Sequence, residues 1–137
     1  MTEPVLVDTT IWIDFLRGGN EPVRDRVSAL VTADKAATAD IIILELLRGA
    51  RSRREYRTLH QDLTALPRLP LTATVWERAW GIGYDLRSKG VHVPTTDTII
   101  AALAIEHACG LLHRDRHFDL IAGCTGLKAL RVEEGSG

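Results

Sequence analysis

The chain has 137 residues, of which 45% are hydrophobic and 26% are charged, and its formal net charge is -1. This length suits one domain that buries a core without disulfide bonds, and the near-neutral charge creates no whole-molecule attraction for nucleic acid. No apolar run approaches the ~20 residues of a membrane-spanning helix. The segment 1–4 has neither the basic region nor the apolar region of a signal peptide. We interpret the two cysteines, Cys109 and Cys124, as small buried hydrophobes, and we expect a cytoplasmic protein.

Short apolar runs alternate with helical patterns along the chain. Strands are predicted at about 4–7, 35–38, 68–71, 111–113 and 127–132. Helices are predicted at about 9–16, 20–31, 40–66 with a break near Gly49, 74–89, 95–109 and 117–122. This alternation is typical of an α/β domain with a parallel sheet. We predict one domain over residues 1–134 and interpret 135–137 as a tail outside it.

Polar residues and glycine mark several helix ends. Asn20 is a good N-cap for the second helix, Asp40 is expected to cap the third, and Thr95 or Thr96 is expected to cap the helix near residue 100. Gly110 is predicted to end that helix in a left-handed conformation.

Four acidic residues stand in apolar segments. Asp8 directly follows the first strand, and Asp115 follows the strand at 111–113. Glu45 interrupts the apolar run 41–47, and Asp97 precedes a stretch, 99–105, that has no polar residue. Ligands of open parallel sheets bind beyond the carboxyl ends of the strands, so we expect these four side chains to converge there.

Carboxylates gathered in one place repel each other, and a divalent cation removes that repulsion. Mg²⁺ and Mn²⁺ prefer oxygen ligands, and one or two such ions can stabilise the attacking and leaving oxygens of phosphodiester hydrolysis. Each acid also has a structural alternative. Asp8 could cap a helix, Glu45 could pair with Arg48, Asp97 could interact with a helix dipole, and Asp115 could be a loop residue.

Four segments carry a family resemblance: 7–13 (VDTTIWI), 43–49 (ILELLRG), 94–102 (PTTDTIIAA) and 112–118 (LHRDRHF). In this order and spacing they resemble the motifs of the PIN domain, and specifically those of the VapC toxins of bacterial toxin–antitoxin pairs. The resemblance covers about residues 5–132. It implies a five-stranded, mostly parallel sheet of order 3-2-1-4-5, flanked by helices.

The same resemblance implies a Mg²⁺- or Mn²⁺-dependent endoribonuclease toxin with a small antitoxin partner. We also expect a homodimer. It implies that Asp8, Glu45, Asp97 and Asp115 form the catalytic and metal-binding set. Thr10 matches a small polar residue that orients a carboxylate or water. His113 departs from the family, which often has a small hydroxyl residue at that position.

Arginines are the candidate contacts for RNA phosphates. The predicted RNA-binding residues are Arg51, Arg53, Arg54, Arg114 and Arg116. The alternative for the cluster that runs from Arg48 to Arg57 is a solvated helix surface, partly paired with Glu55.

Two further patterns keep alternatives open. His113, Asp115 and His117 alternate, and in a strand they could form a transition-metal site. Trp76, Trp80 and Tyr84 recur at helical spacing, which favours a core face, with a dimer or antitoxin interface as the alternative.

The sequence thus predicts a metal-dependent endoribonuclease of a toxin–antitoxin pair. Two other functions remain open: a metal-dependent DNA nuclease or phosphatase that uses the same carboxylates, and a non-catalytic binding module with the same fold.

Overall fold

The computed structural model describes residues 3–132, so the predicted tail at 135–137 lies outside the described residues. The centre of the fold is a sheet of four parallel strands in the order β2-β1-β3-β4. These strands are β1 (Val5–Val7), β2 (Ala36–Ala37), β3 (Gly110–His113) and β4 (Ala129–Arg131). Their order agrees with the prediction from the sequence, and β1 and β3 are neighbours.

The predicted number of five strands is wrong for the described residues. The segment 68–71 lies next to β2, as expected, but it forms only one parallel bridge, between Thr38 and Arg68. Pro67 and Pro70 flank this bridge, and proline has no N–H group to donate to a strand ladder. The edge strand is therefore reduced to a single bridge.

Helices make up most of the described chain. They are α1 (Thr9–Leu16), α2 (Glu21–Thr32), α3 (Asp40–Arg48), α4 (Arg53–Thr64), α5 (Ala73–Ser88), α6 (Thr95–Glu106) and α7 (Arg116–Cys124). The break near Gly49 is confirmed, since α3 ends at Arg48 and Ser52 caps α4.

Asn20 caps α2 as predicted, because its side chain accepts the N–H of Val23 at 3.0 Å. Three other predicted helix ends are wrong. Asp40 is the first residue of α3, and Pro94 precedes α6 without a side-chain cap. At the other end of α6 the left-handed residue is Ala108, with φ +52°.

Gly110 instead begins β3, where it permits a close approach of β4. A Cβ atom at this position would lie 2.7 Å from Cδ1 of Leu130.

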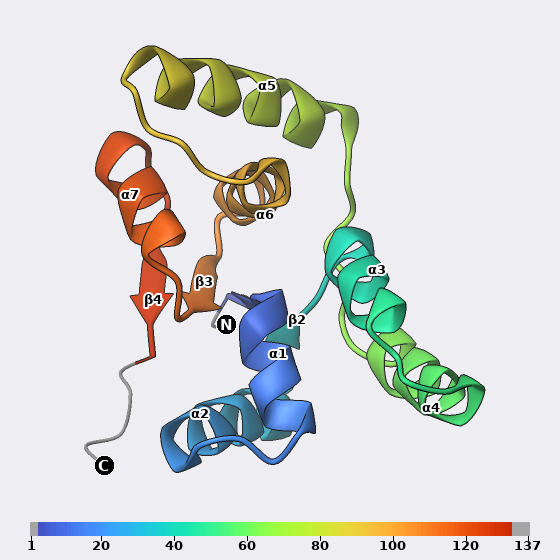
Figure 1. The fold of residues 1–137 in the computed structure, drawn as a ribbon. Helices are drawn as coiled ribbons and strands as arrows, with labels where there is room; N and C mark the ends of the chain where they lie inside the picture. Colours follow the sequence, from blue (N-terminus) through green and yellow to red (C-terminus); the bar gives the residue numbers. More distant parts are fainter. Residues whose placement is uncertain (1–2, 133–137) are drawn as a thin grey trace.

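The helices form layers around the sheet. Figure 1 shows α6 between the strands and α5, with α1 and α2 on the other side of the sheet and the α3–α4 pair at one end. Residues Thr98–Ala104 of α6 are all buried, so this helix forms the centre of the core. No helix among the described residues has the length and hydrophobicity needed to cross a membrane.

The aromatic stripe of α5 does not belong to the core, so that prediction is wrong. Trp76, Trp80 and Tyr84 are 39%, 67% and 76% exposed. The buried residues of α5 are Val75, Ala79, Ile82 and Leu86. The two stripes are adjacent and both are apolar, so their spacing alone did not indicate which one faces α6.

Candidate active site

Asp8 follows β1 at its carboxyl end and is the N-cap of α1. Its backbone N–H donates to the carbonyl oxygen of Leu112 in β3 at 3.0 Å, which fixes the site beside the end of β3. Its side chain caps α1 by accepting the N–H of Thr10 at 3.4 Å. The residue is only 3% exposed. Asp8 therefore caps α1, as its structural alternative proposed. It is also a buried carboxylate at the carboxyl end of the sheet, where the candidate site was predicted.

Glu45 reaches the same region from α3. One of its carboxylate oxygens accepts the hydroxyl of Thr9 at 2.8 Å. The alternative partner, Arg48, forms no ion pair with Glu45 within the described part of the chain. Thr9 is buried, whereas Thr10 is exposed and approaches Asp8 through its backbone. The hydroxyl that orients a carboxylate is thus that of Thr9.

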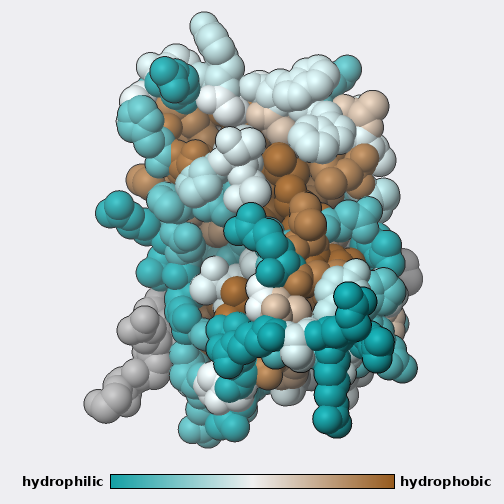
Figure 2. All heavy atoms as spheres, turned by 45° about the vertical axis from the view of Figure 1, so that its right-hand side comes forward, coloured by the Kyte–Doolittle hydropathy of each residue, from teal (hydrophilic) through white to brown (hydrophobic). Residues whose placement is uncertain are grey.

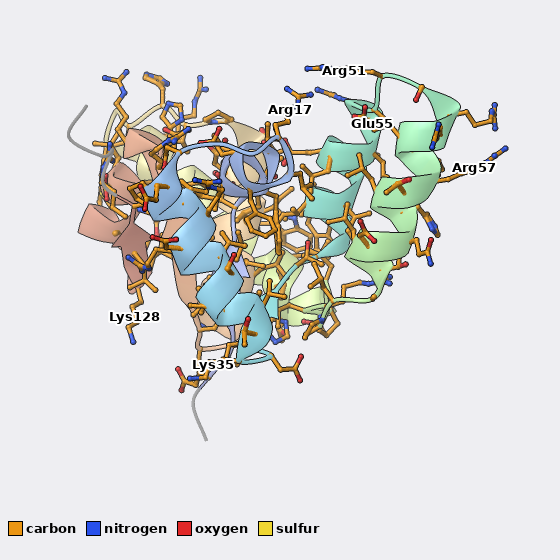
Figure 3. All side chains as sticks on the ribbon, turned by 90° about the horizontal axis from the view of Figure 1, so that it is seen from below. Arg17, Lys35, Arg51, Glu55, Arg57 and Lys128 are labelled. Atoms are coloured by element: carbon orange, nitrogen blue, oxygen red, sulfur yellow. The ribbon has the colours of Figure 1, made fainter. Side chains whose placement is uncertain are left out.

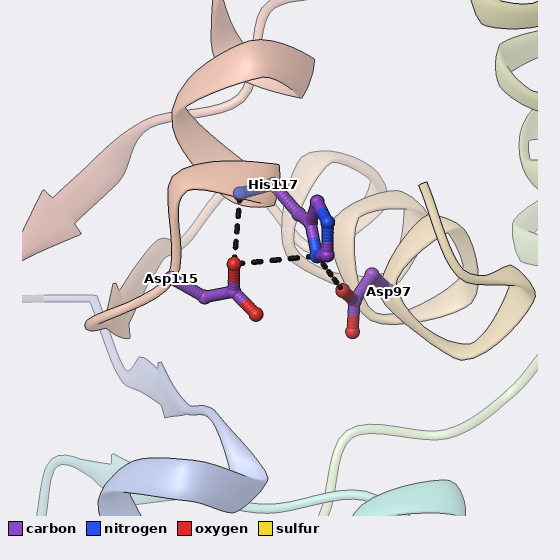
Figure 4. A group of neighbouring side chains, drawn as sticks. All are labelled: Asp97, Asp115 and His117. Carbon is purple, nitrogen blue, oxygen red and sulfur yellow. Dashed lines mark hydrogen bonds and ion pairs between the residues drawn. The ribbon is translucent and has the colours of Figure 1, made fainter. Parts of the chain in front are cut away.

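Asp97 and Asp115 come from the first turn of α6 and the N-cap of α7, and His117 lies between them (Figure 4). The Nδ1 atom of His117 is 3.3 Å from Oδ2 of Asp97 and 3.2 Å from Oδ1 of Asp115. The backbone N–H of His117 donates to the same oxygen of Asp115 at 2.9 Å. One potential ligand atom from each residue lies within 4.8 Å of the other two.

The carboxylates act on each other electrostatically. Burial raises the pKa of Asp8 to about 7, and the nearby charges of Asp97 and Glu45 add to this rise. Burial and the charge of Asp115 also raise the pKa of Asp97, while His117 partly offsets that change. Asp8 therefore interacts with Asp97 and Glu45, and Asp97 interacts with Asp115 and Glu45. The structure brings all four predicted acids together.

This set of donors fits a divalent cation. Buried carboxylates with raised pKa values are costly to ionise unless positive charge is near them. Oxygen ligands of this kind suit Mg²⁺ and Mn²⁺. The Nδ1 atom of His117 is buried and has no hydrogen-bond partner of adequate geometry, although two carboxylates lie beside it.

His113 is fully buried in β3 and does not join this group. Its Nδ1 atom accepts the backbone N–H of Asp115 at 3.1 Å, and its Nε2 atom lies 3.5 Å from Oδ1 of Asp119. Burial lowers the pKa of His113, while Asp119 opposes that change. The alternative of a site with both histidines on one strand is excluded, because His117 lies on α7.

The predicted RNA-binding arginines do not share one environment. Arg114 forms an ion pair with Asp14, whereas Arg51, Arg53, Arg54 and Arg116 are exposed. Arg51 lines a groove of about 370 Å³ together with Arg17 and Glu45. Figure 3 shows Arg17 and Arg51 at the same edge of the molecule, while Arg57 points outward from α4. None of the arginines in the α3–α4 cluster forms an ion pair with Glu55 within residues 3–132.

Sequence reasoning missed Thr9 and Arg17. The sequence did point to Thr9, since two threonines follow Asp8 and the hydroxyl of either could donate to one of the carboxylates. No signal pointed to Arg17, because only the packing of α1 against α3 places it in the groove with Arg51.

Comparisons with known proteins identify the family. The model of the PIN domain matches residues 5–123. VapC ribonuclease Mb1587 of Mycobacterium bovis is 33% identical over 129 residues, which cover 91% of this chain and 96% of that relative. Ribonuclease VapC21 of Mycobacterium tuberculosis is 40% identical over 108 residues, which cover 75% of this chain and 77% of the relative.

Solved structures share the fold. The structure of DNA-bound VapBC from Salmonella typhimurium contains a chain with a TM-score of 0.82 and 20% identity, and the match covers 96% of this chain and all of that one. VapBC2 from Rickettsia felis, bound to a promoter DNA fragment, gives a TM-score of 0.80, with 94% of this chain and 98% of that chain covered at 19% identity. The chain belongs to the PIN domain family and, within it, to the VapC ribonucleases.

Proposed function

We propose that this chain is a divalent-cation-dependent endoribonuclease, the toxin of a toxin–antitoxin pair that acts in the cytoplasm. The observation that carries the proposal is the convergence of Asp8, Glu45, Asp97 and Asp115 at one end of the sheet, with raised pKa values for Asp8 and Asp97. The VapC ribonucleases that match most of the chain support RNA as the substrate.

The residues at this site would have different roles in binding the cation and the RNA. Asp8, Asp97 and Asp115 would hold the cation, and Glu45, oriented by the hydroxyl of Thr9, would complete the acidic set. The exposed Arg51 and Arg17 would hold RNA phosphates at the groove that reaches Glu45. The exposed Arg53, Arg54 and Arg116 would add positive charge for the strand, and Thr10 would help to orient the carboxylate of Asp8 through its backbone N–H. A bound Mg²⁺ or Mn²⁺ would supply Lewis acidity and lower the pKa of a coordinated water.

RNA cleavage by the purified chain tests this function. We expect cleavage with Mg²⁺ or Mn²⁺, none with excess EDTA, and a loss of at least about 100-fold in Asp97→Asn, which keeps the shape of the side chain but removes its charge. Asp25→Asn, on the exposed surface of α2, is the matched control. Full activity of Asp97→Asn, or in EDTA, would contradict the proposal.

The same assay separates the alternatives. Cleavage of DNA or of phosphate monoesters in place of RNA would favour the nuclease or phosphatase alternative. Cation binding without cleavage of any substrate would favour a binding module.

We propose two protein partners, a small antitoxin and a second copy of the chain. The groove beside Glu45 is lined by apolar residues of α1, α3 and α4, including Ile13, Leu16 and Leu59, and would accept the apolar face of an antitoxin helix. The exposed aromatic stripe of α5, with Trp80 and Tyr84, would face the second copy. Figure 2 shows apolar side chains also crossing the face that carries α3, where Leu44 is 61% exposed.

Co-expression with the product of the adjacent small gene tests the antitoxin partner. We expect a stable complex and relief of growth arrest, and the mass in solution measures self-association. No complex and no toxicity when the chain is expressed alone would contradict the toxin assignment.

A further inference from the structure

His117 is the one nitrogen donor that the described residues place among the acidic side chains of the site. Its Nδ1 atom is buried and lacks a hydrogen-bond partner of adequate geometry, although Asp97 and Asp115 lie 3.3 Å and 3.2 Å away (Figure 4). A buried polar atom without a well-formed hydrogen bond is costly, so a cation shared with the two carboxylates would stabilise Nδ1 in this position.

The start of α7 holds the imidazole in this position. Asp115 caps the helix and accepts the backbone N–H of His117 at 2.9 Å. The next residue, Phe118, is fully buried and anchors the first turn in the core. The backbone that carries His117 is therefore anchored beside both carboxylates, and the ring already lies within ion-pair distance of each of them.

The spacing of the donor atoms suits coordination. Neighbouring ligands of an octahedral ion with bonds of about 2.1 Å lie roughly 3.0 Å apart. The two distances from Nδ1 to the carboxylate oxygens, 3.3 Å and 3.2 Å, are close to this value.

We propose that His117 is a ligand of the cation site and makes this site prefer Mn²⁺ to Mg²⁺, an inference that rests on the proposed function. Mg²⁺ takes oxygen ligands and keeps much of its water, whereas imidazole nitrogen binds transition-metal ions more strongly. A neutral ring also adds a ligand without adding another negative charge to the carboxylates. The competing arrangement is an Nδ1–H group that donates to Asp97 and Asp115 and leaves the cation to oxygen ligands alone.

Pulsed electron paramagnetic resonance of the Mn²⁺-loaded protein, without RNA, separates these arrangements. We expect nitrogen-14 coupling from a directly bound imidazole in the wild type and loss of that coupling in His117→Phe. His60→Phe is the matched control, because His60 is exposed in α4 and stacks on Tyr56. A wild-type spectrum without nitrogen coupling overturns the proposal, and this measurement does not depend on how any variant folds.

Calorimetric titration of the metal-free proteins measures the preference. We expect His117→Phe to lose about tenfold in affinity for Mn²⁺ and less than about threefold for Mg²⁺. Equal losses for both ions would overturn the selectivity. If neither ion binds the wild type, the proposed function fails as well, whereas binding of both ions with no change in His117→Phe overturns this inference alone.

Discussion

Three of the four acidic residues have a structural task as well as a place in the site. Asp8 and Asp115 cap α1 and α7, and Asp97 lies in the first turn of α6. The N-terminus of a helix favours negative charge, so three helix ends partly offset the repulsion among the carboxylates. The structural and functional alternatives for these residues are therefore compatible.

Asp8 should make stability depend on pH. Its pKa is about 7 in the folded chain, against an ordinary value of 3.8, so the folded state keeps a proton that the unfolded chain releases. Stability contributed by this proton is present below about pH 4 and is lost as pH rises toward 7. Asp8→Asn should thus stabilise the metal-free fold at pH 8 by on the order of 4 kcal/mol, with little effect near pH 4.

Urea unfolding of the metal-free proteins at both pH values checks this expectation. Asparagine is also a good N-cap, so the bond to the N–H of Thr10 is retained. The variant should gain less stability from Mg²⁺ than the wild type, because cation binding to the folded state is weaker. Lower stability of Asp8→Asn at pH 8, with a full response to Mg²⁺, would assign Asp8 to capping alone.

At the scale of elements, α5 carries large apolar side chains both in the core and on the surface. Ile82 is 7% exposed and packs in the core, whereas Trp80 is 67% exposed. Ile82→Ala should lower the free energy of unfolding by about 2–5 kcal/mol. Trp80→Ala, although it removes a larger side chain, should lower it by less than about 1 kcal/mol in the monomer. Chemical denaturation at low protein concentration measures both, and the reverse ranking would place the aromatic stripe in the core.

The approach of β3 and β4 gives a second test at this scale. Gly110→Ala places a methyl group against Leu130 and should cost about 1–3 kcal/mol through overpacking. Leu130→Ala makes room for that methyl group, so the double variant should be more stable than the sum of the two single changes implies. A strictly additive double variant would mean that Gly110 is needed for another reason.

For the whole molecule, the net charge of -1 supplies no overall attraction for RNA, so the proposed RNA binding would depend on a local group of arginines. Arg51→Ala should weaken RNA binding and reduce the slope of log affinity against log salt by about 0.7, the value for one phosphate contact on a single strand. Arg57→Ala is the control from the same cluster, because its side chain points outward (Figure 3). Binding measured over a series of salt concentrations checks this, and equal slopes for both variants would assign Arg51 to another role.

The sequence by itself determined the class of fold, the order of the main strands and the four acidic residues. The fold class and the acidic residues follow from patterns that are local in the chain: apolar runs of strand length, helical periodicity, and carboxylates placed where apolar segments begin or end. The family resemblance linked these segments across the chain and supplied the strand order.

Only the tertiary structure decided which of several chemically similar residues, close together in the sequence, contact the acidic side chains. Thr9, and not Thr10, donates its hydroxyl to Glu45, because the start of α1 turns Thr9 inward against α3. His117 lies beside Asp97 because it is in the first turn of α7, which Asp115 caps next to the first turn of α6. The predicted fifth strand is a single bridge at Arg68, because prolines flank it. The packing of α5 on α6 decided which apolar stripe of α5 is buried. Each of these outcomes depends on contacts between segments far apart in the chain, which local spacing does not specify.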